Sequence, residues 1–221
     1  MRENFTRCLA NLLVSEGGYS NHPQDPGAQT NMGVTLATYR KWIKKDGTPG
    51  DLKGITREQV AKVYRSVYWN AVKGDDLPSG VDYAVFDYAV NSGPARAVKA
   101  LQMILSVTVD GQVGPETLGA LKTASPVVVI NELYHQRLAF LKGLKTWSTF
   151  GSGWKNRVAA VREDALQLAI QPPAEPQSPP TPAPKPIPIP APVPQDKGLF
   201  GMLLAVVQFI LSLFKKGKPN G

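Results

Sequence analysis

A proline-rich segment divides this chain into parts that cannot share one fold. Between Pro172 and Pro194, 12 of 23 residues are proline, and most of the others are small or apolar. Proline fixes φ and lacks the backbone donor, so this segment can neither extend a helix nor pair within a sheet. It predicts a polyproline II linker over residues 172–197, about 70 Å long at about 3.1 Å per residue. A ligand for a proline-recognising domain is the alternative.

The segment after the linker predicts contact with a membrane. Residues 198–214 carry no charge, and lysines flank them on both sides. At a rise of about 1.5 Å per residue the run spans about 25 Å, the short end of what crosses a bilayer. We predict a transmembrane or membrane-anchoring helix and a basic tail at residues 215–221; a helix lying flat in the interface is the alternative. A stripe of small and weakly polar residues predicts a homo-oligomer through this anchor: Gly201, Ala205, Gln208 and Ser212.

Residues 1–171 are predicted to form one folded domain. In its first helix, a stripe of apolar residues is followed on the same face by a glutamate. The stripe consists of Phe5, Cys8, Leu9, Leu12 and Leu13. Glu16 is the next position on this face, and Gly17 and Gly18 follow it. Burial would raise the pKa of such a carboxyl group, so that Glu16 could donate a proton near neutral pH. The alternative is that Glu16 has no catalytic role and is a hydrogen-bonded residue at the helix end or on the surface.

The residues after Glu16 predict turns or a short hairpin that carries a second carboxylate. Residues 16–35 read EGGYSNHPQDPGAQTNMGVT and are dense in Gly, Pro, Asn and Asp, which end helices. Asp25 lies on this polar loop, where it should stay ionised, and Thr30 offers a hydroxyl able to hold a water. One protonated acid and one ionised carboxylate are the minimum for cleaving a glycosidic bond.

The same string resembles the signature of glycoside hydrolase family 108, phage and bacterial muramidases that usually read approximately EGGY, NDP, DPGG, TN and GIT. Two later stretches, residues 85–98 and 109–117, are similar to the predicted peptidoglycan-binding half that accompanies this family. The resemblance covers roughly residues 3–170. It implies a catalytic half at about residues 3–75 and a wall-binding half at about 76–171.

The resemblance implies roles for three residues. Glu16 would be the catalytic acid, and Asp25 with Thr30 would position the attacking water, as in phage-type lysozymes. The chain departs from the family pattern where His22 replaces an Asp and Ala28 replaces the second Gly of DPGG. If the missing Asp normally shares the role of base, catalysis depends on Asp25 alone.

The predicted function is that of an endolysin-type N-acetylmuramidase, which hydrolyses the β-1,4 bond between N-acetylmuramic acid and N-acetylglucosamine in peptidoglycan. Carboxyl groups about 6.5–9.5 Å apart would indicate inversion, and about 5 Å a covalent intermediate; the sequence leaves both open. The alternatives are a lytic transglycosylase and a non-catalytic wall-binding or morphogenesis protein. We predict that five aromatic and amide side chains bind sugars: Tyr19, Asn31, Tyr68, Trp69 and Asn91. For Tyr68 and Trp69 a core position is the alternative.

The local signals predict a mainly α, lysozyme-like domain with a small β-hairpin or loop near the active site. Helices are expected from Thr35 to about Asp46, from Thr56 towards Asn70, from Val81 to Asn91 and from Pro94 to about Leu105. Pro115 and Pro126 each open a further helix, and the last one runs from about Gly153 to Ile170. The glycine-bounded stretches 47–54 and 74–80 are expected to be breaks.

Composition limits the partners. The net charge of +8 and the pI near 9.6 suit the anionic polymers and lipids of a bacterial envelope. The basic residues are dispersed and no nucleic-acid-binding motif appears, which argues against nucleic acid. Cys8 is the single cysteine, so no internal disulfide forms, and its place in the apolar stripe favours a core residue over a nucleophile.

No cofactor is expected, and no metal, since no His, Cys or acidic cluster has ligand spacing. Residues 1–13 contain charges and read as the first helix of the fold, so we expect no N-terminal signal peptide. The protein is therefore expected to be membrane-associated through residues 198–214, at a host inner membrane or virion membrane, and to act on the cell wall.

Overall fold

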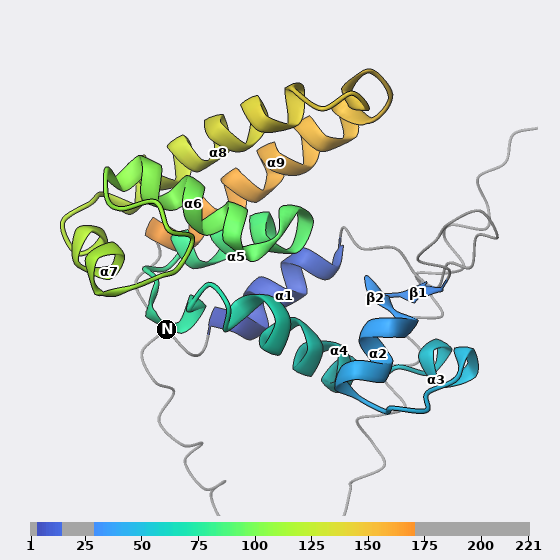
Figure 1. Ribbon diagram of the computed structural model, residues 1–221. Helices are drawn as coiled ribbons and strands as arrows, with labels where there is room; N and C mark the ends of the chain where they lie inside the picture. Colours follow the sequence, from blue (N-terminus) through green and yellow to red (C-terminus); the bar gives the residue numbers. More distant parts are fainter. Residues whose placement is uncertain (1–3, 15–28, 171–221) are drawn as a thin grey trace, which may run out of the picture. The chain divides into compact units, whose positions relative to one another are not determined.

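The computed structural model describes residues 4–14 and 29–170, which form a mainly helical unit with one small hairpin (Figure 1). This confirms the predicted fold class for this part of the chain. The linker at residues 172–197, the apolar run at 198–214 and the tail lie outside the described residues. None of the described helices is long and apolar enough to span a bilayer.

The helical elements follow one another along the chain with short connections. The α-helices are α1 (Asn4–Val14), α2 (Leu36–Trp42), α3 (Pro49–Lys53), α4 (Arg57–Tyr64), α5 (Val81–Ser92), α6 (Pro94–Leu105), α7 (Pro115–Leu121), α8 (Pro126–Lys142) and α9 (Trp147–Ile170). A π-helical turn at Arg65–Trp69 extends α4, and a 3-10 turn lies at Gly74–Asp76. Strands β1 (Thr30–Asn31) and β2 (Val34–Thr35) pair antiparallel, with Thr30 opposite Thr35.

Helix α5 lies at the centre of this unit (Figure 1). Every residue from Val81 to Ala89 is buried, because α1, α6, α8 and α9 pack around it. Because α5 is covered on all sides, apolar residues occur all round it and it shows no amphipathic stripe. Its two acidic residues, Asp82 and Asp87, are therefore carried into the core.

The predicted helix starts are confirmed where local chemistry sets them. The Thr35 hydroxyl accepts a hydrogen bond from the Thr38 backbone N–H, and Thr56 forms the expected capping box with Gln59. Each of the three prolines occupies the first turn of its helix: Pro94 in α6, Pro115 in α7 and Pro126 in α8. These signals act within four residues, so tertiary packing leaves them unchanged.

Three helix boundaries differ from the prediction. Helix α2 ends at Trp42 rather than near Asp46. The expected break at residues 47–54 contains α3, because Thr48 and Asp51 form a capping box that starts a single turn. Helix α9 begins at Trp147 rather than Gly153. The Trp147 ring packs so closely on Gly151 that a Cβ at position 151 would lie only 2.6 Å from it.

The start of α5 requires glycine at position 80. Gly80 has φ +86°, and a Cβ there would lie 2.2 Å from the Ala165 carbonyl oxygen of α9. We expect Gly80→Ala to lower the free energy of unfolding by about 3 kcal/mol, through backbone strain and overpacking. Gly119→Ala in α7 is the control, because no atom lies within 4 Å of its added Cβ. It should raise stability by about 0.5–1 kcal/mol. Urea unfolding of both variants would show this, and equal stability would contradict it.

Candidate functional site

The predicted catalytic segment is bounded by well-defined elements. Glu16, Tyr19 and Asp25 lie at residues 15–28, outside the described residues. Helix α1 ends two positions before Glu16, and its buried residues are Phe5, Cys8, Leu9 and Leu12. The apolar face that the sequence predicted is thus confirmed, and so is the core position of Cys8. Burial raises the pKa of the Cys8 thiol, which opposes formation of the thiolate.

The hairpin after this segment is held on two sides. Met32 and Gly33 form its two-residue loop with φ values of 47° and 72°, the sign that a type I′ turn requires. The Tyr64 hydroxyl donates to the Met32 carbonyl at 3.1 Å. On the other side, the Asn31 side-chain amide donates to the carbonyls of Leu52 and Lys53 at 3.1 and 3.0 Å. These contacts fix the half-buried Thr30 next to the predicted catalytic segment.

Asn31 was predicted to bind sugar, and the structure places it differently. Its side chain is buried, with a relative exposure of 6%, and both bonds of its amide nitrogen go to the end of α3. Asn31 therefore anchors the hairpin to α3.

Tyr68 and Trp69 lie on the π-helical turn and differ in exposure. Trp69 is fully buried, and its indole N–H donates to Asp75 at 3.0 Å. The prediction that Trp69 stacks on a sugar is wrong for this structure, because a buried ring presents no face to a ligand. Tyr68 is half-buried and its ring lies 5.6 Å from that of Tyr64, so it remains a candidate.

Asn91 lies at the exposed end of α5. Its side-chain amide donates to the Asp87 carbonyl oxygen at 2.8 Å and to the Asp87 carboxylate at 3.3 Å. It also lines a cavity of about 130 Å³ together with residues of α8 and α9. Of the described candidates, Asn91 is the one that lines a cavity of this kind.

A buried ion-pair network lies behind this cavity. Arg137 of α8 donates to one Asp87 carboxylate oxygen at 2.7 Å, and Arg157 of α9 donates to the other at 3.0 Å. Asp87 and Arg137 have side-chain exposures of 1% and 5%. The network joins α5, α8 and α9 at one point, and the sequence analysis did not identify it. Its partners are 50 and 70 residues from Asp87, beyond the reach of spacing rules.

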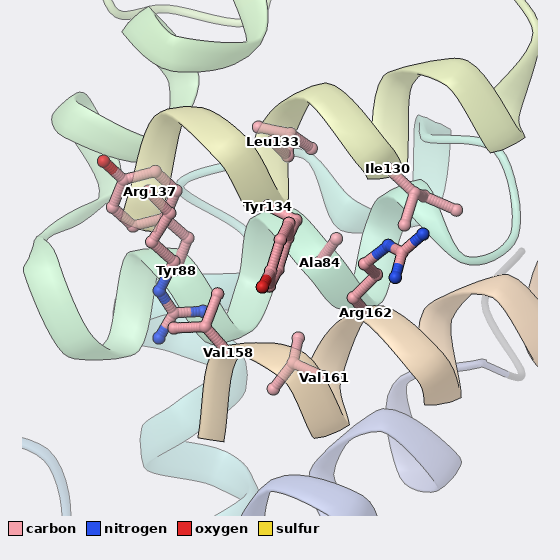
Figure 2. A pocket seen from close by; sticks show the side chains of 9 residues that line it. All are labelled: Ala84, Tyr88, Ile130, Leu133, Tyr134, Arg137, Val158, Val161 and Arg162. Atoms are coloured by element: carbon pink, nitrogen blue, oxygen red, sulfur yellow. The ribbon is translucent and has the colours of Figure 1, made fainter. Parts of the chain in front are cut away.

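Figure 2 shows a smaller space between the same three helices. Arg137 and Tyr88 stand at one end of it, Arg162 and Ile130 at the other, and Tyr134 lies between them. The volume is about 10 Å³, which is close to the size of one water. It is therefore a packing gap rather than a substrate site.

Asp82 is a second buried carboxylate that the sequence analysis did not identify. Its two oxygens accept hydrogen bonds from the Gly80 and Tyr83 backbone N–H groups and from the Asn4 side chain, at 2.7–2.8 Å. Burial is the dominant influence and raises its pKa to about 6, although these hydrogen bonds favour the charged form. The hydrogen bonds tie the first turn of α5 to α1, which is a structural role.

The raised pKa of Asp82 predicts a pH-dependent stability. Below about pH 4 both folded and unfolded states hold the proton, whereas above about pH 6 the folded state must bury a charge. The wild type should therefore lose stability relative to Asp82→Asn as pH rises between these values, by on the order of 3 kcal/mol in total. Urea unfolding of both proteins at pH 4, 5, 6 and 7 would measure this difference. A constant difference across the range would contradict the assignment.

Comparisons with known proteins agree with the resemblance seen in the sequence. Residues 9–93 match the family described as Glycosyl hydrolase 108. The structure is similar to that of Brucella abortus SagA, with 46% sequence identity and a TM-score of 0.70, over 77% of this chain and 98% of that one. The chain belongs to glycosyl hydrolase family 108. Residues 96–159 match a second family, described as Predicted Peptidoglycan domain. Among curated proteins, none matches the chain significantly.

This family 108 protein is a glycoside hydrolase, and its second domain makes peptidoglycan its partner. The two matched regions meet between α5 and α6, where Gly93 with φ +90° leads into Pro94. Helices α8 and α9 nevertheless pack directly on α5. The hydrolase and peptidoglycan regions are therefore parts of one core. Among the described residues, no three His, Cys, Asp or Glu side chains are grouped as metal ligands would be.

Proposed function

We propose that this protein is an N-acetylmuramidase, which hydrolyses the β-1,4 bond between N-acetylmuramic acid and N-acetylglucosamine in peptidoglycan. The observation that carries the proposal is the match of residues 9–93 to Glycosyl hydrolase 108, followed directly by a peptidoglycan domain in the same core. Both substrate class and reaction type follow from this pair. The choice of bond rests on the muramidase signature at residues 16–35.

Glu16 is proposed to protonate the leaving oxygen, while Asp25 orients or deprotonates the attacking water. The apolar face of α1, which leads directly to Glu16, supports an acid with a raised pKa. Thr30 is proposed to help hold the water, from a hairpin that Tyr64 and Asn31 fix in place. These roles need no cofactor.

The test is digestion of purified peptidoglycan by the full chain, with the released fragments identified by mass and by their ends. A muramidase leaves reducing muramic ends. Anhydro-muramic ends would identify a lytic transglycosylase, a reaction that needs the acid but no water-holding Asp; His22, where the family usually has Asp, makes this the second candidate. Binding to peptidoglycan without released fragments would identify a wall-binding protein instead.

We also propose that the apolar run at residues 198–214 attaches the enzyme to a membrane, as a tethered endolysin would require. The linker would let the hydrolase domain search the wall while staying at high local concentration. Flotation with lipid vesicles should recover the full chain and leave a chain ended at Gln171 behind. Crosslinking of the full chain in the vesicles would then test self-association through Gln208 and its neighbours.

A further inference from the structure

Three aromatic residues gather at the start of α9. The rings of Trp147 and Phe150 lie 6.4 and 5.8 Å from that of Trp154, and Phe150 is 54% exposed. Gly151 leaves room for the Trp147 ring, since a Cβ there would lie 2.6 Å from it. We call these three residues the aromatic platform. Aromatic faces of this kind are suited to stacking against the face of a sugar ring.

The cavity of about 130 Å³ lies directly beside this platform, and Trp154 belongs to both. The polar part of its lining comes from Asn91 and Ser92 at the end of α5, Arg137 of α8 and Arg157 of α9. The apolar part comes from Leu141, Leu144 and Val158. Its volume is too small for a whole disaccharide and suits one short side group.

The polar part of the lining offers both kinds of hydrogen-bonding atom. Ser92, the half-buried last residue of α5, lines the cavity with a hydroxyl group that can donate a hydrogen bond. Asn91 uses its side-chain nitrogen on Asp87, which leaves its carbonyl oxygen to accept from a ligand. The cavity therefore matches a group that combines an acceptor, a donor and a small apolar end.

An acetamido group has this combination. Its carbonyl oxygen accepts, its N–H donates, and its methyl group would pack against Leu141 and Val158. We propose that the cavity and the aromatic platform form a subsite for one N-acetylated amino sugar of peptidoglycan, whose ring stacks on Trp154 and whose acetamido group enters the cavity. The proposal rests on the proposed function for its substrate and adds where the peptidoglycan region holds the glycan.

The charge around the subsite agrees with this ligand. No acidic residue occurs between Glu132 and Glu163, whereas Lys142, Lys145 and Lys155 surround the platform in the sequence. Muramic acid and the stem peptides carry carboxylates along the glycan strand. An anionic membrane would also attract these lysines and aromatic rings, but it has no group that calls for a cavity with paired donor and acceptor. The glycan is therefore the favoured occupant.

The experiment is a titration of the full chain with a soluble tetramer of β-1,4-linked N-acetylglucosamine, followed by tryptophan fluorescence. The same tetramer without its acetyl groups should bind at least 10-fold more weakly. Trp154→Ala should weaken binding of the acetylated tetramer at least 10-fold, whereas Trp42→Ala, at the end of α2, should change it less than 2-fold. Ser92→Leu fills the cavity without removing packing, and it should lower affinity at an unchanged unfolding temperature.

Equal binding of the two tetramers, or unchanged binding by both Trp154→Ala and Ser92→Leu, would overturn the subsite. The subsite would also be overturned if Trp154→Ala still bound the tetramer but no longer bound vesicles of anionic phospholipid. That result would identify a membrane-facing surface. Hydrolysis of peptidoglycan is measured in parallel with the wild type. If the protein releases fragments but binds both tetramers equally, the subsite is contradicted and the proposed muramidase activity stands. If it prefers the acetylated tetramer but releases no fragments, the subsite stands and the muramidase activity is contradicted.

Discussion

Glu16→Gln is expected to lower the rate of peptidoglycan hydrolysis by about 10²–10⁴-fold, which is the usual contribution of a general acid. Glutamine has nearly the same shape as glutamate but cannot supply a proton. Position 16 follows the buried face of α1, on which Phe5, Cys8, Leu9 and Leu12 pack into the core. The loss should therefore appear in the rate, without a fall in the unfolding temperature.

The measurement is fragment release from purified peptidoglycan at several pH values, with Glu132→Gln as the matched control. Glu132 is an exposed glutamate on α8, and its substitution should leave the rate unchanged. Glu16→Gln should keep its binding to insoluble peptidoglycan, because its loss falls on the chemical step. A variant that keeps the wild-type rate would remove Glu16 from the mechanism. A variant that unfolds at lower temperature would make Glu16 a structural carboxylate instead.

The features that sequence predicted correctly are those decided within a few residues. The cap of α2 by Thr35, the capping box of α4 and the prolines that open α6, α7 and α8 all depend on neighbouring atoms. The buried stripe of α1 depends only on helical period. The start of α9 was predicted too late because glycine disfavours a helix locally, whereas Gly151 lies inside α9 and the Trp147 ring packs against it.

The roles of the candidate site residues could not be predicted in this way, because they depend on contacts between distant parts of the chain. Trp69 and Trp154 look alike in sequence, each within an aromatic cluster at helical spacing. One is fully buried and bonded to Asp75, and the other lines a cavity. The difference comes from what packs against each helix, and no local rule contains it. For the same reason Asn31 was taken for a ligand-binding amide, although its partners on α3 are 21 and 22 residues away.

Asp87 illustrates how a functional region and a structural core coincide. It lies within residues 9–93, which match Glycosyl hydrolase 108, and its carboxylate pairs with Arg137 and Arg157 of the peptidoglycan region at residues 96–159. Those same arginines line the cavity beside the aromatic platform. The shape of the proposed sugar subsite therefore depends on an ion pair between the hydrolase and peptidoglycan regions.

Asp87→Ala is expected to lower the free energy of unfolding by about 3–5 kcal/mol, because it leaves buried guanidinium charge without its carboxylate. This is a large part of the about 5–15 kcal/mol that holds a typical domain together. Asp46→Ala serves as the control, since Asp46 is exposed after α2 and should change stability by less than about 0.5 kcal/mol. Urea unfolding monitored by circular dichroism would measure both. A loss below about 1 kcal/mol for Asp87→Ala would contradict the buried network.

A double-mutant cycle separates the ion pair from the packing around it. Asp87→Leu removes the charge and keeps apolar volume, and Arg137→Met does the same on α8. The double variant removes both partners of this ion pair, while Arg157 loses the same carboxylate as in Asp87→Leu. Because most of the cost of a single variant is the unpaired charge, the double variant should be more stable than the sum of the two losses predicts, by about 1–3 kcal/mol. Strict additivity would mean that Arg157 alone compensates Asp87. In that case Arg137→Met would leave stability nearly unchanged and would affect sugar binding through the cavity alone.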